Sequence, residues 1–220
     1  MCAIAGIFAY REQASPISGD ELLIIRDSML SRGPDDEGLW IDTRRRIGLA
    51  HRRLAIIDLA PSGAQPMKSL NGALAITFNG EIYNYKELRI GLEGRGHRFR
   101  SESDTEVLLQ LYAERGSEMV KELRGMFAFA IWDESKQGLF LARDSFGIKP
   151  LYYSDDGGTF RFASQVKALV RGGGVDTSPE PAGHVGFFLW GSVPEPFTLH
   201  KGIKSLPAGK SLWIERTGKK

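Results

Sequence analysis

The stretch from Cys2 to Tyr10, CAIAGIFAY in one-letter code, decides the fold more than any other part of the sequence. It is apolar and short, which suits a buried central strand better than a helix. It begins with the only cysteine among the 220 residues. Removal of Met1 would make Cys2 the N-terminal residue, with a free α-amine beside its thiol. This context favours a nucleophile at Cys2, and an inert buried cysteine is the alternative.

The composition limits the kinds of molecule that this protein is expected to bind. A formal net charge of +2, with acidic and basic residues mixed along the chain, gives no basic surface for nucleic acid or an anionic membrane. We find no apolar run as long as a membrane span and no secretory signal pattern, so we expect a cytoplasmic protein. One cysteine excludes an intrachain disulfide and any multi-cysteine metal site, and we assign no metal ligands.

Outward from the first strand, the pattern predicts strands near both ends of the chain and helices between them. Expected strands cover 38–41, 46–50, 53–59, 73–78, 126–133, 138–143, 151–154 and 159–164. Expected helices cover 20–31 and 119–123, and two more begin at the capping pairs Asn84/Glu87 and Ser103/Glu106. Runs of strands, rather than strict strand–helix alternation, favour an α+β fold with sheets packed face to face and covered by helices.

Glycine and proline become dense after residue 170. We therefore expect a core over 1–170 and a peripheral tail of the same domain over 171–220, with a short strand at 212–215. The tail contains GGGVDTS (172–178), which superficially resembles a pyrophosphate-binding loop. Such a loop needs a strand before it and a helix after it. The preceding residues look helical, and Pro179 and Pro181 argue against a following helix, so we do not assign a nucleotide site.

The residues offer the groups that hydrolysis of an amino-acid amide needs. With its α-amine free, Cys2 supplies a thiol and a base whose ordinary pKa is ~8, so no histidine is required. Asn79 and Gly80 follow an apolar strand and offer an amide side chain and a backbone N–H as oxyanion donors. An ordinary Asn-Gly turn is the alternative for this pair.

Charged residues could hold the amino-acid end of a substrate. Glu81 and Asp104 could bind an ammonium group, although a solvated turn and a helix start are their alternative roles. Arg53 offers the planar fork that suits an α-carboxylate, and a surface ion pair is its alternative role.

Seven motifs in order carry a family resemblance over nearly the whole chain. They are MCAIAGIF (1–8), RGPDDEG (32–38), LAHRRLAIIDL (49–59), NGEIYNY (79–85), SDTEVLL (103–109), GMFAFAIWD (125–133) and RDSFGIKPLYY (143–153). Together they resemble the class II glutamine amidotransferase domain of asparagine synthetases. NGEIYNY and RGPDDEG are closer to this family than to the amidotransferases that feed amino sugars or purines.

The resemblance implies a fold and a set of roles. The fold would be the four-layer αββα sandwich of N-terminal-nucleophile hydrolases. Cys2 would be the nucleophile and its α-amine the general base, and Asn79 and Gly80 would be the oxyanion donors. The positions that bind glutamine in the family fall here on Arg53, Leu54, Ile56, Glu81 and Asp104. RDSFGIKP is expected mainly to form a structural turn, with lining of the ammonia exit as its alternative role.

The resemblance also implies a missing activity. In the family, a second domain uses ATP to adenylate aspartate, and these residues contain no equivalent. We therefore expect glutamine as substrate, no cofactor in this domain, ATP and magnesium only in a synthetase domain, and that domain as a partner in a longer chain or separate subunit. A homodimer, a stand-alone amidase acting on another amino-acid amide, and a non-catalytic regulatory domain remain open.

Overall fold

The first strand, β1 (Ala3–Ala9), lies at the centre of the fold, as the sequence predicts. The computed structural model describes residues 2–55 and 61–217. Every residue of β1 is buried, and successive side chains point to opposite faces. Ile4 and Phe8 pack into one apolar core, whereas Ala5 and Ile7 pack into another. Both faces are covered, which explains the absence of polar residues from this stretch.

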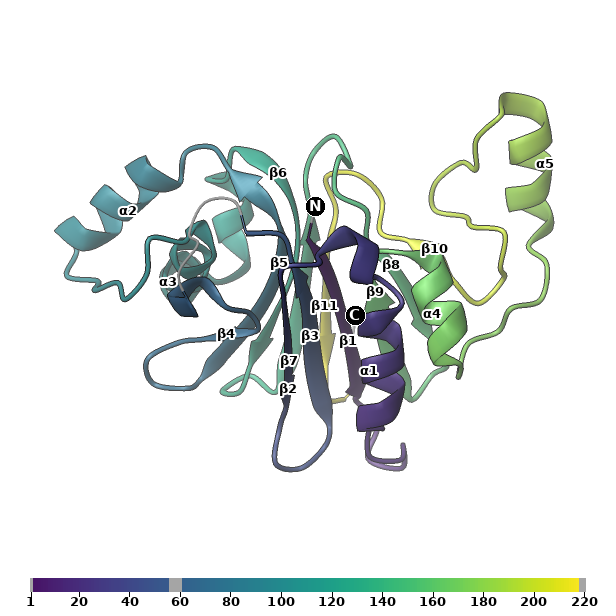
Figure 1. The fold of residues 1–220 in the computed structure, drawn as a ribbon, viewed down its shortest axis with the longest axis horizontal. Coiled ribbons are helices and arrows are strands. Elements are labelled where there is room, and N and C mark those ends of the chain that lie inside the picture. The colour runs from purple at the N-terminus through teal and green to yellow at the C-terminus, as the bar shows by residue number, and fades with distance from the viewer. Residues whose placement is uncertain (1, 56–60, 218–220) are drawn as a thin grey trace.

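Two antiparallel sheets form the middle of the molecule (Figure 1). The first, in spatial order, contains β10 (Lys204–Ser205), β8 (Tyr152–Asp155), β9 (Thr159–Ala163), β1, β3 (Ile47–Arg53) and β2 (Asp36–Ile41). The second contains β11 (Ser211–Glu215), β7 (Gly138–Arg143), β6 (Gly125–Asp133), β5 (Leu74–Ile82) and β4 (Met67–Lys68). The predicted strands therefore occur with small shifts at their ends, except at 53–59.

Three apolar cores show that the layers follow the order helix, sheet, sheet, helix. The central core joins Ile4 and Phe8 of the first sheet to Ala130 and Leu141 of the second. A second core packs the first sheet against α1 (Gly19–Asp27) and α4 (Val166–Gly172). A third packs the other sheet against α2 (Tyr85–Gly94) and α3 (Asp104–Arg115), on the opposite side of the molecule (Figure 1). The structure is the expected four-layer αββα sandwich.

The helix starts follow the predicted capping pairs only in part. Ser18 caps α1 by accepting the Glu21 N–H at 3.2 Å, and Ser103 caps α3 by accepting the Thr105 N–H at 3.2 Å. Asn84 precedes α2, but the prediction that it caps this helix is wrong. Its side-chain oxygen instead accepts the Arg124 N–H and its amide donates to Glu122, so it ties the start of α2 to the segment before β6.

The remaining helical turns are short. The helix predicted over 20–31 is divided into α1 and the 3₁₀ turn η1 (Leu30–Arg32). The helix predicted over 119–123 is a second such turn, η3 (Gly116–Lys121), and η2 (Pro61–Gly63) is a third.

Two further predictions from local sequence are wrong. The strand expected over 53–59 does not form at its start, because β3 ends at Arg53 and residues 54 and 55 are in no strand. Residues 56–60 lie outside the described part of the chain. A helix also follows GGGVDTS after all, since α5 (Pro181–Trp190) begins at Pro181. Proline is tolerated at the first helical position, where the N–H has no intrahelical acceptor. The element before GGGVDTS is the helix α4, so the strand that a phosphate loop needs is absent there.

The segment after residue 170 contributes to both sheets. β10 pairs with β8, and β11, which confirms the strand predicted at 212–215, pairs with β7. The boundary at residue 170 stays a prediction. α5 projects from the sandwich (Figure 1) and exposes Phe188 and Trp190, with 83% and 67% of their surfaces accessible. No helix within residues 2–55 and 61–217 is long and apolar enough to cross a membrane.

Candidate active site

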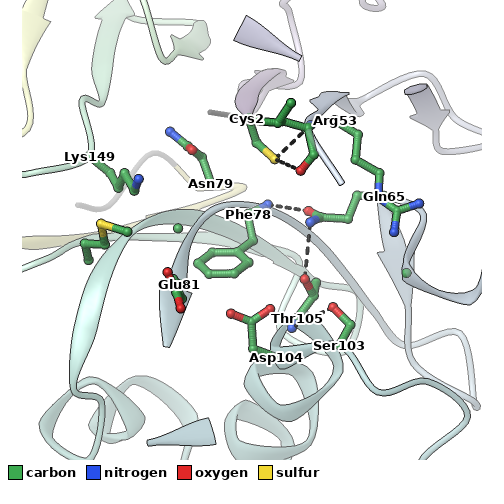
Figure 2. Close-up of a pocket in the computed structure, with 14 residues that line it drawn as sticks. Cys2, Arg53, Gln65, Phe78, Asn79, Glu81, Ser103, Asp104, Thr105 and Lys149 are labelled. Atoms are coloured by element: carbon green, nitrogen blue, oxygen red, sulfur yellow. Dashed lines mark hydrogen bonds between the residues drawn. The ribbon is translucent and has the colours of Figure 1, made fainter. Parts of the chain in front are cut away.

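Seven chain segments, from both sheets, one helix and the loops between them, line a pocket beside Cys2 (Figure 2). Cys2 precedes β1, Arg53 ends β3, Asn79 to Glu81 lie near the end of β5, and Asp104 begins α3. The lining residues are Cys2, Arg53, Leu54, Gly63, Gln65, Phe78, Asn79, Gly80, Glu81, Ser103, Asp104, Thr105, Met126 and Lys149. Seven of the eight site residues expected from the sequence therefore line one cavity. The eighth, Ile56, lies outside the described residues.

The pairing of β1 with β3 positions the Cys2 thiol. Ala3 lies opposite Arg52, which brings Cys2 next to the end of β3. There the Leu54 N–H donates to Cys2 Sγ at 3.3 Å, and the thiol donates to the Leu54 carbonyl at 3.5 Å. Burial raises the thiol pKa, while the bond from Leu54 and nearby positive charges lower it. The thiol is thus held at the pocket wall and is mainly protonated near neutral pH, so attack needs a base.

Asn79 is a buried donor whose side-chain amide faces the pocket. Its side chain is 1% exposed, and its Nδ2 has no partner among the described residues. Because a buried amide that donates to nothing costs about 1–3 kcal/mol, the site carries a penalty that an incoming acceptor would remove. Figure 2 shows the Asn79 amide between Lys149 and Cys2. This is the arrangement that an oxyanion donor requires.

The backbone N–H of Gly80 also points toward the pocket. Gly80 lies opposite Phe127 of β6, whose N–H and C=O both bond to Asp144 on the far side. The N–H and C=O of one strand residue point to the same side, so both groups of Phe127 point away from β5. Gly80 and Phe127 are therefore a non-hydrogen-bonded pair, and the Gly80 N–H points away from β6. Every second N–H of a strand points to the same side, so the N–H groups of Phe78 and Ile82 share the direction of that of Gly80. They donate to the pocket residues Gln65 and Asp104, at 2.6 and 3.1 Å respectively. A Cβ at Gly80 would lie 2.3 Å from the Met126 carbonyl, so only glycine fits.

Two carboxylates form another wall of the pocket. Asp104 is 4% exposed, and its Oδ2 accepts the Ile82 N–H at 3.1 Å. Burial raises the pKa of Asp104 to about 6; the N–H bonds from Ile82 and Thr105 oppose this shift, and the negative charge of Glu81 adds to it. Glu81 is partly exposed in the same wall. Because the charge of Glu81 raises the pKa of its neighbour Asp104, this pair forms a site that would favour a cation.

Arg53 supplies a positive charge on the opposite wall. It is 8% exposed and lies 3.8 Å from Asp36, measured between Nη1 and Oδ2. Figure 2 shows its side chain beside Cys2 and Gln65, across the cavity from Lys149. The pocket therefore presents a cation, a pair of carboxylates and the thiol on separate walls.

Other lining residues, which were not predicted from the sequence, hold this arrangement together. Gln65 links two elements, since its amide oxygen accepts the Phe78 N–H at 2.6 Å and its Nε2 donates to Thr105 at 3.2 Å. No sequence signal identifies Gln65, whereas Thr105 lies in the motif SDTEVLL, next to Asp104. Lys149 lies in RDSFGIKP, a motif that was interpreted mainly as a structural turn.

No histidine is among the described residues that line the pocket. His51 is 1% exposed behind it, where Nε2 lies 3.0 Å from the Phe78 carbonyl, and burial lowers its pKa to about 4. It is therefore a neutral link between the sheets. Within residues 2–55 and 61–217, no three His, Cys, Asp or Glu side chains are grouped so that they could hold a metal ion.

The sequence matches the family described as "Glutamine amidotransferase domain" over residues 1–220. The chain belongs to that family. This glutamine amidotransferase domain is 40% identical over 220 residues to asparagine synthetase [glutamine-hydrolyzing] 1 of Bacillus subtilis (strain 168), a match that covers 99% of the domain and 34% of the relative. It is 44% identical over 170 residues to asparagine synthetase 2 of the same strain, with 77% of the domain and 22% of the relative covered.

The domain spans about one third of the first of these relatives. Its fold also matches that of the B. subtilis glutamine phosphoribosylpyrophosphate amidotransferase solved with ADP and GMP. The TM-score is 0.70 at 21% identity, and the match covers 100% of the domain and 48% of the solved chain. At this identity the likeness concerns the fold alone. The domain is an enzyme of the glutamine amidotransferase class and matches the glutaminase part of asparagine synthetases.

Proposed function

We propose that this domain hydrolyses glutamine to glutamate and ammonia with Cys2 as nucleophile. The observation that carries the proposal is the convergence of the Cys2 thiol with two donors, Asn79 Nδ2 and the Gly80 N–H, in one pocket. A thiol and paired donors are what acyl transfer from an amide requires. The family match supports glutamine as the amide.

The reaction follows from the positions of these groups. Sγ of Cys2 attacks the side-chain amide carbon of glutamine, and the free α-amine takes the thiol proton. The carbonyl oxygen becomes negative between Asn79 and Gly80. The α-amine then returns the proton to the departing nitrogen, so ammonia leaves and a thioester remains. Water attacks that thioester, giving glutamate and the free thiol. No step needs a cofactor.

The charged walls fix the orientation of the substrate. We assign the α-carboxylate of glutamine to Arg53 and its ammonium group to Glu81 and Asp104, since these charges lie on opposite sides of the pocket. Leu54 and Ile56 are assigned to the same binding site. A simple amide would offer neither an α-carboxylate to Arg53 nor an ammonium group to Glu81 and Asp104, which argues for an amino-acid substrate.

We further propose that the ammonia passes to a synthetase domain that activates a carboxylate, with aspartate as the acceptor. Two observations support a partner of this kind. The relative named asparagine synthetase 1 is matched over only 34% of its length, so most of it lies outside this domain. The exposed apolar side chains of α5 also form a surface of the type that protein contacts cover.

Replacing the charged residues of the pocket one at a time tests whether the substrate is an amino acid. Arg53→Met, Glu81→Gln and Asp104→Asn should each raise KM for glutamine roughly 10- to 100-fold, because each removes a charge-assisted hydrogen bond. Ammonia release is measured without added nucleotide or metal. Asp176→Asn, a change at an exposed carboxylate outside the pocket, serves as control. Unchanged KM in all three variants would favour an amidase that acts on a different amide.

The pH dependence gives the same experiment a second readout. Asp104 must be ionised to hold the substrate ammonium, and its pKa is raised to about 6. Thus kcat/KM for glutamine should fall as the pH decreases below about 6. In Asp104→Asn, kcat/KM should be low at every pH, and the fall in kcat/KM at acidic pH should disappear. An identical fall in the variant would mean that another group controls it.

A further inference from the structure

Lys149 is a buried cation in the pocket to which the proposed reaction assigns no role. It is 4% exposed and lines the cavity with Cys2, Asn79 and Glu81. Figure 2 shows its side chain on the Asn79 side, across the cavity from Arg53. The two cations therefore flank opposite ends of the space in which the substrate would lie.

The position of Lys149 is fixed relative to the oxyanion donors. The buried Asp144 carboxylate accepts the N–H groups of Ile148 and Lys149 at 3.0 Å each, and also that of Phe127 at 3.2 Å. Arg143 Nε donates to the Lys149 carbonyl at 2.8 Å. Since Phe127 lies directly opposite Gly80, Asp144 connects the backbone of Lys149 to the strand pair that carries the donors. RDSFGIKP is thus a structural turn that also positions a charge.

The charges around Lys149 come from several elements. Burial lowers the pKa of its ammonium group, and Arg32 lowers it further. Cys2, Glu81 and Asp144 oppose this effect. The positive charge of Lys149 in turn lowers the pKa of the Cys2 thiol, although burial raises that pKa by more. The ammonium therefore acts on the reacting end of the pocket, at low solvent exposure where charges are weakly screened.

We propose that Lys149 stabilises the negative charge that develops on Cys2 Sγ and on the oxygen held by Asn79 and Gly80. Arg53 serves the opposite end by holding the α-carboxylate. This inference rests on the proposed glutaminase function. The two cations should therefore have different kinetic effects. Loss of the Lys149 charge should lower kcat, because it acts on the chemical step, whereas loss of the Arg53 charge should raise KM, because it acts on binding.

The reactivity of Cys2 tests the charge of Lys149 directly. The chain has one cysteine, so the rate of alkylation by iodoacetamide against pH reports the Cys2 thiol alone. Lys149→Met should move this curve to higher pH by about half a unit or more. Lys149→Arg should keep the curve close to that of the parent. Lys204→Met removes the same charge from an exposed position outside the pocket and should leave the curve unchanged.

Glutamine kinetics complete the test. Lys149→Met should lower kcat roughly tenfold with little change in KM, and Lys149→Arg should restore most of kcat. An alkylation curve that does not move in Lys149→Met, or that moves equally in Lys149→Arg, overturns the inference. The alkylation measurement needs no turnover. A shifted curve in a protein that cannot release ammonia from glutamine would therefore refute the glutaminase function while supporting the charge effect.

Discussion

Replacing Cys2 with alanine should lower ammonia release from glutamine by about a thousandfold or more, because no other side chain can form the thioester. The change removes one sulfur atom, and its described hydrogen bonds are to Leu54 alone. Arg53, Glu81 and Asp104 remain in place, so glutamine should still bind. The measurements are ammonia release under saturating glutamine and the shift of the melting temperature that glutamine produces.

The matched control for Cys2→Ala is Ser28→Ala, another small side-chain change, made at the end of α1. Ser28 Oγ donates to the Ile24 carbonyl at 2.7 Å outside the pocket, so this variant should keep its activity. A Cys2→Ala variant that retains more than a few per cent of the parental rate would refute a cysteine nucleophile. A variant that is inactive and also fails to gain stability from glutamine would show that the substitution had damaged the binding site.

Asn79→Ala should have the second largest effect and lower kcat for glutamine by about 100- to 1,000-fold. The reason lies in the unpartnered Nδ2: no described group loses a hydrogen bond from this nitrogen, whereas the oxyanion loses a donor. KM should change little, since the ground-state carbonyl carries less charge than the oxyanion. Steady-state kinetics with glutamine measure the effect.

Asn84→Ala is the control for the Asn79 experiment, because it removes an amide with a structural role. Asn84 bonds to Arg124 and Glu122 outside the pocket, so its loss should lower the melting temperature with kcat nearly unchanged. The reverse pattern, a melting-temperature loss in Asn79→Ala with normal kcat, would assign Asn79 to the fold instead of the oxyanion.

Local sequence predicted the strands well because the apolar runs are buried on both faces. β1, β6 and β7 illustrate this, since their burial leaves little room for polar residues. The errors occur where a single residue type supports two conformations. Pro181 starts α5 where a helix break was predicted, and Asn84 uses its side chain for a tertiary contact where a cap was predicted. Apolarity alone predicted a separate strand over 53–59, although β3 ends at Arg53 and residues 54 and 55 are in no strand.

The pocket was predictable only where residues carry a recognisable motif. Asn79, Gly80 and Glu81 belong to NGEIYNY, and Asp104 opens a helix with a clear cap. Gln65 is different, because its role depends on contacts with Phe78 and Thr105, at sequence separations of 13 and 40 residues. No local pattern encodes such contacts. Lys149 was missed for a related reason: only the packing of its turn against β6 brings its charge to Cys2.

The most direct test of a Cys2 nucleophile with a free α-amine is the intact mass spectrum of the domain after incubation with an electrophilic glutamine analogue. The spectrum separates chains that retain Met1 from chains that have lost it, and fragmentation locates the adduct. We predict one adduct per chain, on Cys2, confined to molecules that lack Met1, and competition by glutamine. An adduct on another residue, or equally rapid labelling of Cys2 in chains that retain Met1, would contradict this account.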